Sequence, residues 1–231
     1  MRDIGELVVL ALVIYLVITF VVQTVHVEGQ SMVPTLHNND LLVADKITLD
    51  FQGPSRGEIV VIQPPISSPT DFIKRVIGLP GEWIRIAPDA KGIGHVYVDR
   101  HHPVGAGGGE ELREPYVNGL WRDEVQCCTS RGQASPTLPP SGHWVRIPAR
   151  DYFVMGDNRN VSEDSRTFGW EPRSGIVAVA RFRFWPLNRI ATLPGPVPTP
   201  VPSAALGALG ALPMVRRRRR GRHSMGRPPA P

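Results

Sequence analysis

The sequence predicts a mainly β protein, built on an antiparallel β-sheet and preceded by one N-terminal transmembrane helix. Three observations support this prediction: one long apolar run near the N-terminus, short β-branched or aromatic runs after it, and no helical periodicity beyond residue 26. Gly, Pro, Asn and Asp separate the short runs, as is typical of strands joined by turns. With 42% apolar residues, the 231-residue chain can form one large or two small domains and is not disordered throughout.

The apolar run extends from Leu7 to Val22, and only Thr19 interrupts it. With its flanking residues it approaches the roughly 20 residues that cross a bilayer. A cleaved signal peptide would need a basic start, a shorter apolar core and a small-x-small cleavage site. The chain starts with MRDIGE and has no Ala-x-Ala after the run. We therefore predict an uncleaved anchor over residues 1–25, with a cytoplasmic N-terminus because Arg2 and the terminal amine precede it.

Short runs with strand character follow the anchor: DLLVADKI, GEIVVIQ, DFIKRVIGL, EWIRI, HVYVD, HWVRIP, YFVMGD and GIVAVARFRF. Residues 87–141 are richer in loop sequences such as GAGGGEELREP, and only isolated strand-like runs lie between these loops. We expect a main β domain over 26–86 and 142–190, with a smaller β lobe inserted over 87–141. Residues 191–231 are rich in proline and then in arginine, and we expect a disordered tail.

The basic charge of the chain is concentrated in this tail. Seven arginines cluster within residues 216–227, beyond the last acidic residue, Glu171, and without these seven the formal charge of +5 becomes −2. The body therefore lacks the basic face of a nucleic-acid-binding protein, and no nucleic-acid partner is expected. A basic tail that touches anionic lipid headgroups is the favoured interpretation. The alternative is a second membrane contact through the twelve apolar residues 204–215, which are too few for a spanning helix.

Ser31, in GQSMVPTL, lies directly after the apolar run, but a hydroxyl is a weak nucleophile unless a base takes its proton. His26 and His37 lie in the same segment without an acidic orienter, so nothing marks out a Ser-His-Asp triad. The other available base is a lysine whose pKa is lowered by burial. The chain has three lysines against 23 arginines, and Lys74 lies within the apolar run DFIKRVIGL.

Strand alternation places Phe72, Lys74 and Val76 on one face. Apolar neighbours of this kind lower the pKa of an ammonium group. The alternative is a lysine that extends its amine to solvent from an edge strand. A third segment, YFVMGDNRNVSEDSRTFGW, offers two possible Asp–Arg pairs and the hydroxyl of Ser162, which could be set against a neutral amine.

Five segments occur in this order after the apolar anchor: GQSMVPTL, DLLVADK, RGEIVVI, DFIKRVIGLPGE and GDNRNVSEDSRTFG. Together they resemble the bacterial type I signal peptidases, the membrane-bound leader peptidases, over roughly residues 22–187. The resemblance implies a serine endopeptidase in the cytoplasmic membrane, with its catalytic domain on the extracytoplasmic side. It implies cleavage of signal peptides from exported precursor proteins after small-x-small sites, through an acyl-enzyme. Signal peptides and membrane lipid are the expected partners, and no cofactor or metal is expected.

The resemblance also implies roles for single residues. Ser31 would be the nucleophile and Lys74 the general base, and Ser162 would hydrogen-bond and orient the lysine amine. Two ion pairs would brace the implied site: Asp157–Arg75 and Asp164–Arg166. The substrate pockets would be lined by Val25, Val27, Ile73 and, beside the nucleophile, Met32. Some members carry a serine two residues before the nucleophile, whose hydroxyl helps to hold the oxyanion. Here this position is Gly29, which has no hydroxyl. The backbone N–H of Ser31 therefore remains as the donor to the oxyanion.

Two other classes of function stay open from the residues alone. One is another Ser-Lys protease, such as the self-cleaving SOS-type repressors, which lack a membrane anchor and carry a DNA-binding module. The other is a membrane-tethered binding protein without catalytic activity. A metal site built from His101, His102, Cys127 and Cys128 fits no common zinc spacing. The adjacent cysteines also predict no framework of disulfides.

Overall fold

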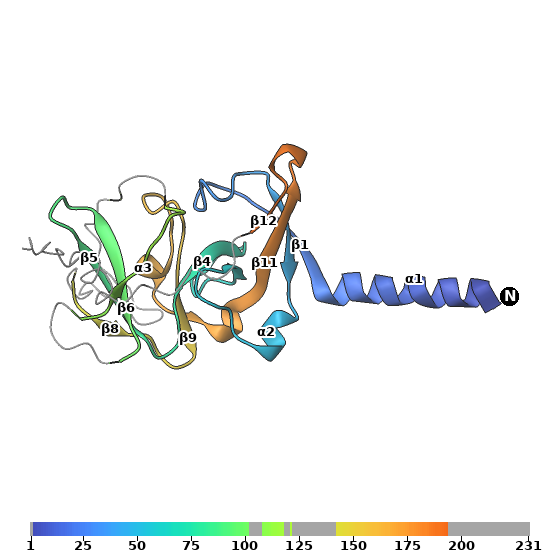
Figure 1. The fold of residues 1–231 in the computed structure, drawn as a ribbon, viewed down its shortest axis with the longest axis horizontal. Helices are drawn as coiled ribbons and strands as arrows, with labels where there is room; N and C mark the ends of the chain where they lie inside the picture. Colours follow the sequence, from blue (N-terminus) through green and yellow to red (C-terminus); the bar gives the residue numbers. More distant parts are fainter. Residues whose placement is uncertain (1, 102–107, 118–120, 122–141, 194–231) are drawn as a thin grey trace, which may run out of the picture. The chain divides into compact units, whose positions relative to one another are not determined.

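The computed structural model describes residues 2–101, 108–117, 121 and 142–193. Helix α1 (Arg2–Val21) leads directly into strand β1 (Val22–His26) (Figure 1). Among the described residues, no helix combines the length and the hydropathy of a membrane-spanning helix. The transmembrane helix expected within residues 1–25 therefore stays a prediction.

Eight strands form the main sheet, in the spatial order β1-β2-β11-β3-β4-β9-β10, with β12 paired to β11. Every neighbouring pair is antiparallel, which confirms the predicted mainly antiparallel β fold. The strands after β1 are β2 (Leu41–Asp45), β3 (Ile59–Ile62), β4 (Phe72–Gly78), β9 (Asp151–Met155), β10 (Glu171–Pro172), β11 (Ile176–Trp185) and β12 (Ala191–Thr192). Short helical turns lie between them: α2 (Thr48–Phe51), α3 (Ser165–Phe168), η1 (Arg173–Gly175) and η2 (Leu187–Arg189).

A second, four-stranded antiparallel sheet has the order β7-β6-β5-β8. Its strands are β5 (Trp83–Pro88), β6 (Gly94–Asp99), β7 (Glu110–Glu111) and β8 (Val145–Arg146). This sheet extends beyond both ends of the lobe expected over 87–141, of which residues 102–107, 118–120 and 122–141 lie outside the described residues. The division into domains stays a prediction.

Strand β1 corrects the expected end of the anchor. Residues 22–25, assigned to the anchor from sequence, pair with β2 instead, with Val25 opposite Leu42. The apolar run continues through Val22 without a break, so hydrophobicity alone cannot separate the end of a helix from the start of a strand. The hydrogen-bonding partner β2, which lies in a later segment, decides the boundary.

The start of the expected tail is also corrected. Ala191 and Thr192 pair with Arg183 and Phe182 of β11, so the first residues of the tail belong to the main sheet. Residues 194–231, which include the arginine cluster and the stretch 204–215, lie outside the described residues.

Strand β9 connects the two main apolar cores of the protein. Phe153 and Met155 pack into a core with residues of the second sheet, such as Ile84, whereas Tyr152 and Val154 pack into a core on the opposite face of the main sheet. Because successive side chains of a strand point to opposite faces, a strand covered on both sides needs an uninterrupted apolar run. This requirement explains the sequence YFVM.

We expect Phe153→Ala to lower the free energy of unfolding by about 3–5 kcal/mol, because it leaves a cavity in the core. The Phe153 ring is fully buried and lies 5.7 Å from the Trp170 ring, centroid to centroid. Phe51→Ala is the matched control: Phe51 is 85% exposed, so its loss should change stability by no more than about 0.5 kcal/mol. Equilibrium denaturation in urea measures both, and equal losses would contradict this account of the core.

Candidate active site

Ser31 lies in a closed loop between β1 and β2. The loop is closed at its base by two backbone hydrogen bonds: Val27 N–H donates to Asp40 O, and Asn39 N–H donates to Val27 O, both at 2.9 Å. The buried side chains of Met32 and Leu36 hold the loop against the core. Ser31 itself remains partly exposed. The loop is therefore anchored by its apolar residues, which leaves the hydroxyl accessible.

Gly29 has a structural reason to be glycine. Its φ of +90° lies in the left-handed region that side chains disfavour. Its N–H donates to Asn38 Oδ1 at 2.9 Å, which holds this backbone conformation. A serine at this position would be strained, so the absence of a hydroxyl next to the nucleophile follows from the conformation of the loop.

Lys74 comes from the middle of β4, opposite Val60 of β3, and is only 3% exposed. Its Nζ lies 3.2 Å from Ser31 Oγ, within hydrogen-bonding distance. The Nζ also lies 5.0 Å from the centroid of the Phe72 ring. The strand therefore presents Phe72 and Lys74 on one side, as the alternation predicts, and the amine is buried rather than extended to solvent.

The environment of the Lys74 amine favours its neutral form. Burial lowers the pKa of Lys74 from 10.5 to about 8, because an ammonium group loses its hydration there. The nearby carboxylates Asp164 and Glu163 oppose this effect, and Arg166 adds to it. At mildly alkaline pH the amine is available as a base.

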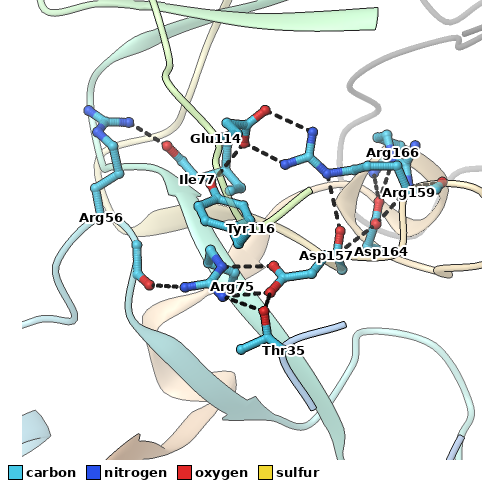
Figure 2. A network of polar contacts seen from close by, with 12 residues as sticks. Thr35, Arg56, Arg75, Ile77, Glu114, Tyr116, Asp157, Arg159, Asp164 and Arg166 are labelled. Carbon is cyan, nitrogen blue, oxygen red and sulfur yellow. Dashed lines mark hydrogen bonds and ion pairs between the residues drawn. The ribbon is translucent and has the colours of Figure 1, made fainter. Parts of the chain in front are cut away.

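The first bracing pair, Arg75 and Asp157, is completely buried. Arg75 Nε donates to Asp157 Oδ1 at 2.7 Å and Nη2 donates to Oδ2 at 2.5 Å, so the contact is bidentate. Thr35 Oγ1 also donates to Asp157 Oδ2 at 2.5 Å. Thr35 lies in the Ser31 loop, so the pair connects β4 with the nucleophile loop (Figure 2). The sequence analysis gave Thr35 no role.

The second bracing pair, Asp164 and Arg166, holds the turn before α3. Arg166 Nε and Nη2 donate to the two Asp164 oxygens, each at 2.9 Å, and Asp164 also caps α3 by accepting from Arg166 N–H at 3.1 Å. Gly156 N–H donates to Asp164 Oδ2 at 3.0 Å. Burial by itself would raise the pKa of Asp164, but the hydrogen bonds and charge of Arg166 outweigh it, so the pKa lies below its ordinary value of 3.8.

Ser162 differs from its predicted arrangement. Its Oγ is buried and has no hydrogen-bond partner among the residues that the structure describes, so the expected bond to the Lys74 amine is not formed there. The hydroxyl lies beside Gly156 instead: a Cβ added at Gly156 would come within 2.2 Å of Ser162 Oγ and 2.5 Å of the Ser31 carbonyl oxygen. Only glycine permits this close approach, which places the Ser162 hydroxyl and the Ser31 carbonyl beside the same backbone position.

Asn158 is a further residue that the sequence analysis did not assign. Its backbone N–H donates to Ser31 O at 3.0 Å, and its Nδ2 donates to Gln30 O at 3.1 Å. The turn that follows β9 therefore holds the backbone of the nucleophile directly. The run GDN within the fifth matched segment is the sequence signal for this turn, but it does not reveal which carbonyl the asparagine meets.

A groove with a volume of about 700 Å³ opens at Ser31 and Lys74. All four expected pocket residues line it: Val25, Val27, Met32 and Ile73. Strand β1 is an edge strand of the sheet, and β9 pairs with β4 only from Arg75 onward. In the described part of the chain, the outer edge of β1 and the β9-facing edge of residues 72–74 of β4 are thus unpaired beside the groove.

No group of three or more His, Cys, Asp or Glu side chains that could hold a metal occurs among the described residues. His101 is described, whereas His102, Cys127 and Cys128 are not, so the weak metal-site alternative lies mostly outside the structure.

The family model described as signal peptidase, peptidase S26, matches residues 1–185. The chain belongs to this family. A signal peptidase I from Leptolyngbya laminosa is 36% identical over 207 residues, covering 86% of this chain and 84% of the relative. A signal peptidase I from Bacillus caldolyticus is 34% identical over 172 residues, covering 74% of this chain and 84% of the relative. The protein is therefore a serine peptidase of the signal peptidase I type.

Two further similarities are of the same kind. A probable signal peptidase I-2 from Synechocystis is 34% identical over 199 residues, covering 83% of this chain and 76% of the relative. A crystal structure of a signal peptidase I from Enterococcus faecalis shares 26% identity, covers 55% of this chain and 97% of that chain, and has a TM-score of 0.38.

The buried amine predicts a gain in stability for Lys74→Met at neutral pH. The lowered pKa means that protonated Lys74 destabilises the folded state, and the interval from 10.5 to about 8 corresponds to about 3 kcal/mol. Methionine should recover up to this amount at pH 7. The difference should shrink as the pH rises from 8 to 10.5, because the unfolded wild type then releases its proton too.

Chemical denaturation at several pH values measures this difference. Lys46→Met is the matched control: Lys46 is exposed, and its replacement should change stability by no more than about 0.5 kcal/mol at any pH. An equal effect of the two substitutions at pH 7 would show that Lys74 carries no burial penalty.

Proposed function

We propose that the protein is a membrane-bound signal peptidase I in which Ser31 is the nucleophile and Lys74 is the general base. The observation that supports this most directly is the 3.2 Å distance between a buried lysine amine and a serine hydroxyl at the opening of a groove. A buried amine with a lowered pKa is the base that an isolated serine requires. Membership of a serine peptidase family favours catalysis over a membrane-tethered binding protein without activity.

The reaction starts with the neutral Lys74 amine, which accepts the proton of Ser31 Oγ while Oγ attacks the carbonyl carbon of the scissile bond. The resulting tetrahedral intermediate collapses to an acyl-enzyme, and protonated Lys74 gives its proton to the departing amine of the mature protein. The lysine then accepts a proton from water, which attacks the ester. When the second tetrahedral intermediate collapses, the lysine returns this proton to the departing Ser31 Oγ, and the signal peptide leaves with its new carboxylate. One amine thus serves in both half-reactions.

The oxyanion of the intermediate needs a hydrogen-bond donor. In the described part of the chain, none of the hydrogen bonds uses the Ser31 N–H, so this donor is available for the substrate. The loss of one such donor costs about 2.7–4 kcal/mol in other serine peptidases. Asn158 Nδ2 donates to Gln30 O at 3.1 Å, and because this carbonyl belongs to the peptide unit that carries the Ser31 N–H, the contact helps to keep the donor in place.

We infer that the substrate binds as an extended strand between β1 and the beginning of β4. Both flank the groove and have unpaired edges, so a peptide can form main-chain hydrogen bonds there. Alternate side chains of a strand point the same way, and the apolar lining by Val25, Val27 and Ile73 suits small residues at two alternate positions. This arrangement supports cleavage after a small-x-small site.

The proposal includes the membrane. The apolar segment within residues 1–25 would anchor the chain as a single pass with the N-terminus in the cytoplasm, so that the site meets exported precursors as they emerge. Ser162 is proposed to orient the Lys74 amine when substrate excludes water from the groove. Its unpartnered, buried hydroxyl supports this role because such a group gains most from a new hydrogen bond.

The decisive experiment is cleavage of a precursor with an Ala-x-Ala site by the purified full-length protein. Ser31→Ala and Lys74→Arg should each lower kcat by at least about a thousandfold, because arginine keeps the charge but cannot become a neutral base. Lys46→Arg is the control for the lysine substitution and should keep the wild-type rate. Turnover by Lys74→Arg near the wild-type rate would remove Lys74 from the role of base.

We expect kcat/KM to rise with pH to a plateau, with a midpoint near the lysine pKa of about 8. Below this pH the amine is protonated and cannot accept the Ser31 proton. Glu163→Gln removes a carboxylate that raises the pKa of Lys74, so its midpoint should move to lower pH. A rate independent of pH between about 6 and 10 would contradict the neutral-amine mechanism.

A further inference from the structure

Three side chains from the region of the second sheet reach the arginines that surround the active site. Tyr116 lies against Arg75, with the guanidinium carbon 3.9 Å from the ring centroid. Trp121 lies against Arg159 and Arg166, at 5.1 and 5.3 Å. Glu114 pairs with Arg159 (Figure 2). The site is thus supported from a part of the chain that supplies none of the expected catalytic or pocket residues.

The Glu114–Arg159 contact is a buried, bidentate ion pair. Arg159 Nη1 donates to Glu114 Oε2 at 2.9 Å, and Nη2 donates to Oε1. The Arg159 side chain is 1% exposed and that of Glu114 is 9% exposed. Tyr116 Oη also donates to Glu114 Oε1, at 2.9 Å, which orients the carboxylate. A pair with this geometry and burial holds both of its segments in one relative position.

The segment that carries Glu114 is itself fixed to the second sheet. It follows β7, which pairs with β6, and Leu112 N–H donates to Val96 O at 2.8 Å. Val117 N–H closes a turn by donating to Glu114 O at 3.1 Å. The carboxylate is therefore presented from a short irregular segment that is hydrogen-bonded to the second sheet.

From Arg159, a short chain of contacts leads to the nucleophile. Arg159 Nε donates to Gly156 O at 3.1 Å, and Arg159 O accepts from Arg166 Nη2 at 2.8 Å. The turn held in this way contains Asn158, whose N–H donates to Ser31 O at 3.0 Å. Gly156 in turn lies in close contact with Ser31 O and Ser162. Arg159 thus fixes the turn that contacts both serines.

We propose that Glu114 and Arg159 are positioning residues of the peptidase, through which the second sheet holds the Gly156–Asn158 turn and thereby Ser31 in reactive geometry. The inference rests on the proposed roles of Ser31 and Lys74. Neither residue of the pair contacts the Ser31 or Lys74 side chain, so both act through the backbone of the turn. Misplacement of a reacting group by about 1 Å can cost a hundredfold in rate, so a small shift of this turn is sufficient to be measured.

A second arginine–glutamate pair provides a matched control. Arg56 Nη2 donates to both Glu82 oxygens at 2.6 Å, and the side chains are 12% and 7% exposed. Like the first pair, it joins a segment of the main sheet to one of the second sheet. It differs in its backbone contact, because Arg56 donates to Ile77 O rather than to the turn beside Ser31. A purely structural role predicts equal consequences for the two pairs.

The test compares Glu114→Gln with Glu82→Gln in the full-length protein, using the Ala-x-Ala precursor and thermal unfolding. Both should lower Tm, since each leaves a buried arginine without its counter-charge. Glu114→Gln should in addition lower kcat at least about tenfold with KM changed less than about twofold, whereas Glu82→Gln should keep kcat within about twofold. Equal effects of the two substitutions on kcat, whether large or absent, would overturn the proposal.

If a glutamine variant fails to fold, Arg159→Lys and Arg56→Lys test the positioning role instead. These substitutions keep both charges of each ion pair. Lysine has one nitrogen and cannot pair bidentately with Glu114 while also donating to Gly156 O. Arg159→Lys should therefore lower kcat at least about tenfold, and Arg56→Lys should not. Wild-type kcat for Arg159→Lys would overturn the positioning role while leaving the Ser31→Ala result, and with it the proposed function, unaffected.

Discussion

The exclusion of water from one lysine amine is the constraint on which the rest of this structure depends. In solvent, the amine of Lys74 would be protonated at any physiological pH and useless as a base. At 3% exposure, beside the Phe72 ring and 3.2 Å from Ser31 Oγ, it loses its hydration, and its pKa falls to about 8. The folded protein carries this cost in stability, and in the proposed mechanism the neutral amine acts as the base in place of a histidine.

The buried arginines around the site are each neutralised by a carboxylate, close to the Lys74 amine. Arg75 and Arg166 each have an aspartate bound through two hydrogen bonds, and Arg159 has Glu114. The carboxylates are thus engaged with guanidinium groups rather than with the lysine. Asp164 still raises the pKa of Lys74, and Arg166 lowers it, so the two members of one pair act on the amine in opposite directions. Burial is the largest of the effects on the amine, so the pKa of Lys74 is lowered.

The two sheets contribute different parts of the site. The main sheet supplies the nucleophile loop, the lysine strand and the groove between β1 and β4. The second sheet contributes packing behind the turn after β9, through the shared core at Phe153 and Met155 and through Glu114, Tyr116 and Trp121. The turn after β9 lies between these two contributions, which is why residues that never meet the substrate can influence the position of Ser31.

Several features of the protein follow from the sequence alone. The ordered segments make Ser31 and Lys74 the candidate reacting pair. Strand alternation places Lys74 on the same side as Phe72, because alternation depends only on neighbours within a few positions. The two aspartate–arginine pairs also follow from the resemblance. Other features required the tertiary structure: strand β1 at the end of the apolar run, the unpartnered hydroxyl of Ser162, and the contacts of Thr35, Asn158 and Glu114.

These features differ in how far apart along the sequence the residues lie that determine them. Periodicity and turn chemistry are local, whereas a hydrogen bond between residues 43 or 45 positions apart exists only once the sheets have packed. The sequence by itself determined which groups are the candidates for reaction and on which face of its strand the lysine lies. Only the tertiary structure decided how far that amine is from water, which backbone turn holds the serine, and which distant carboxylate holds the turn.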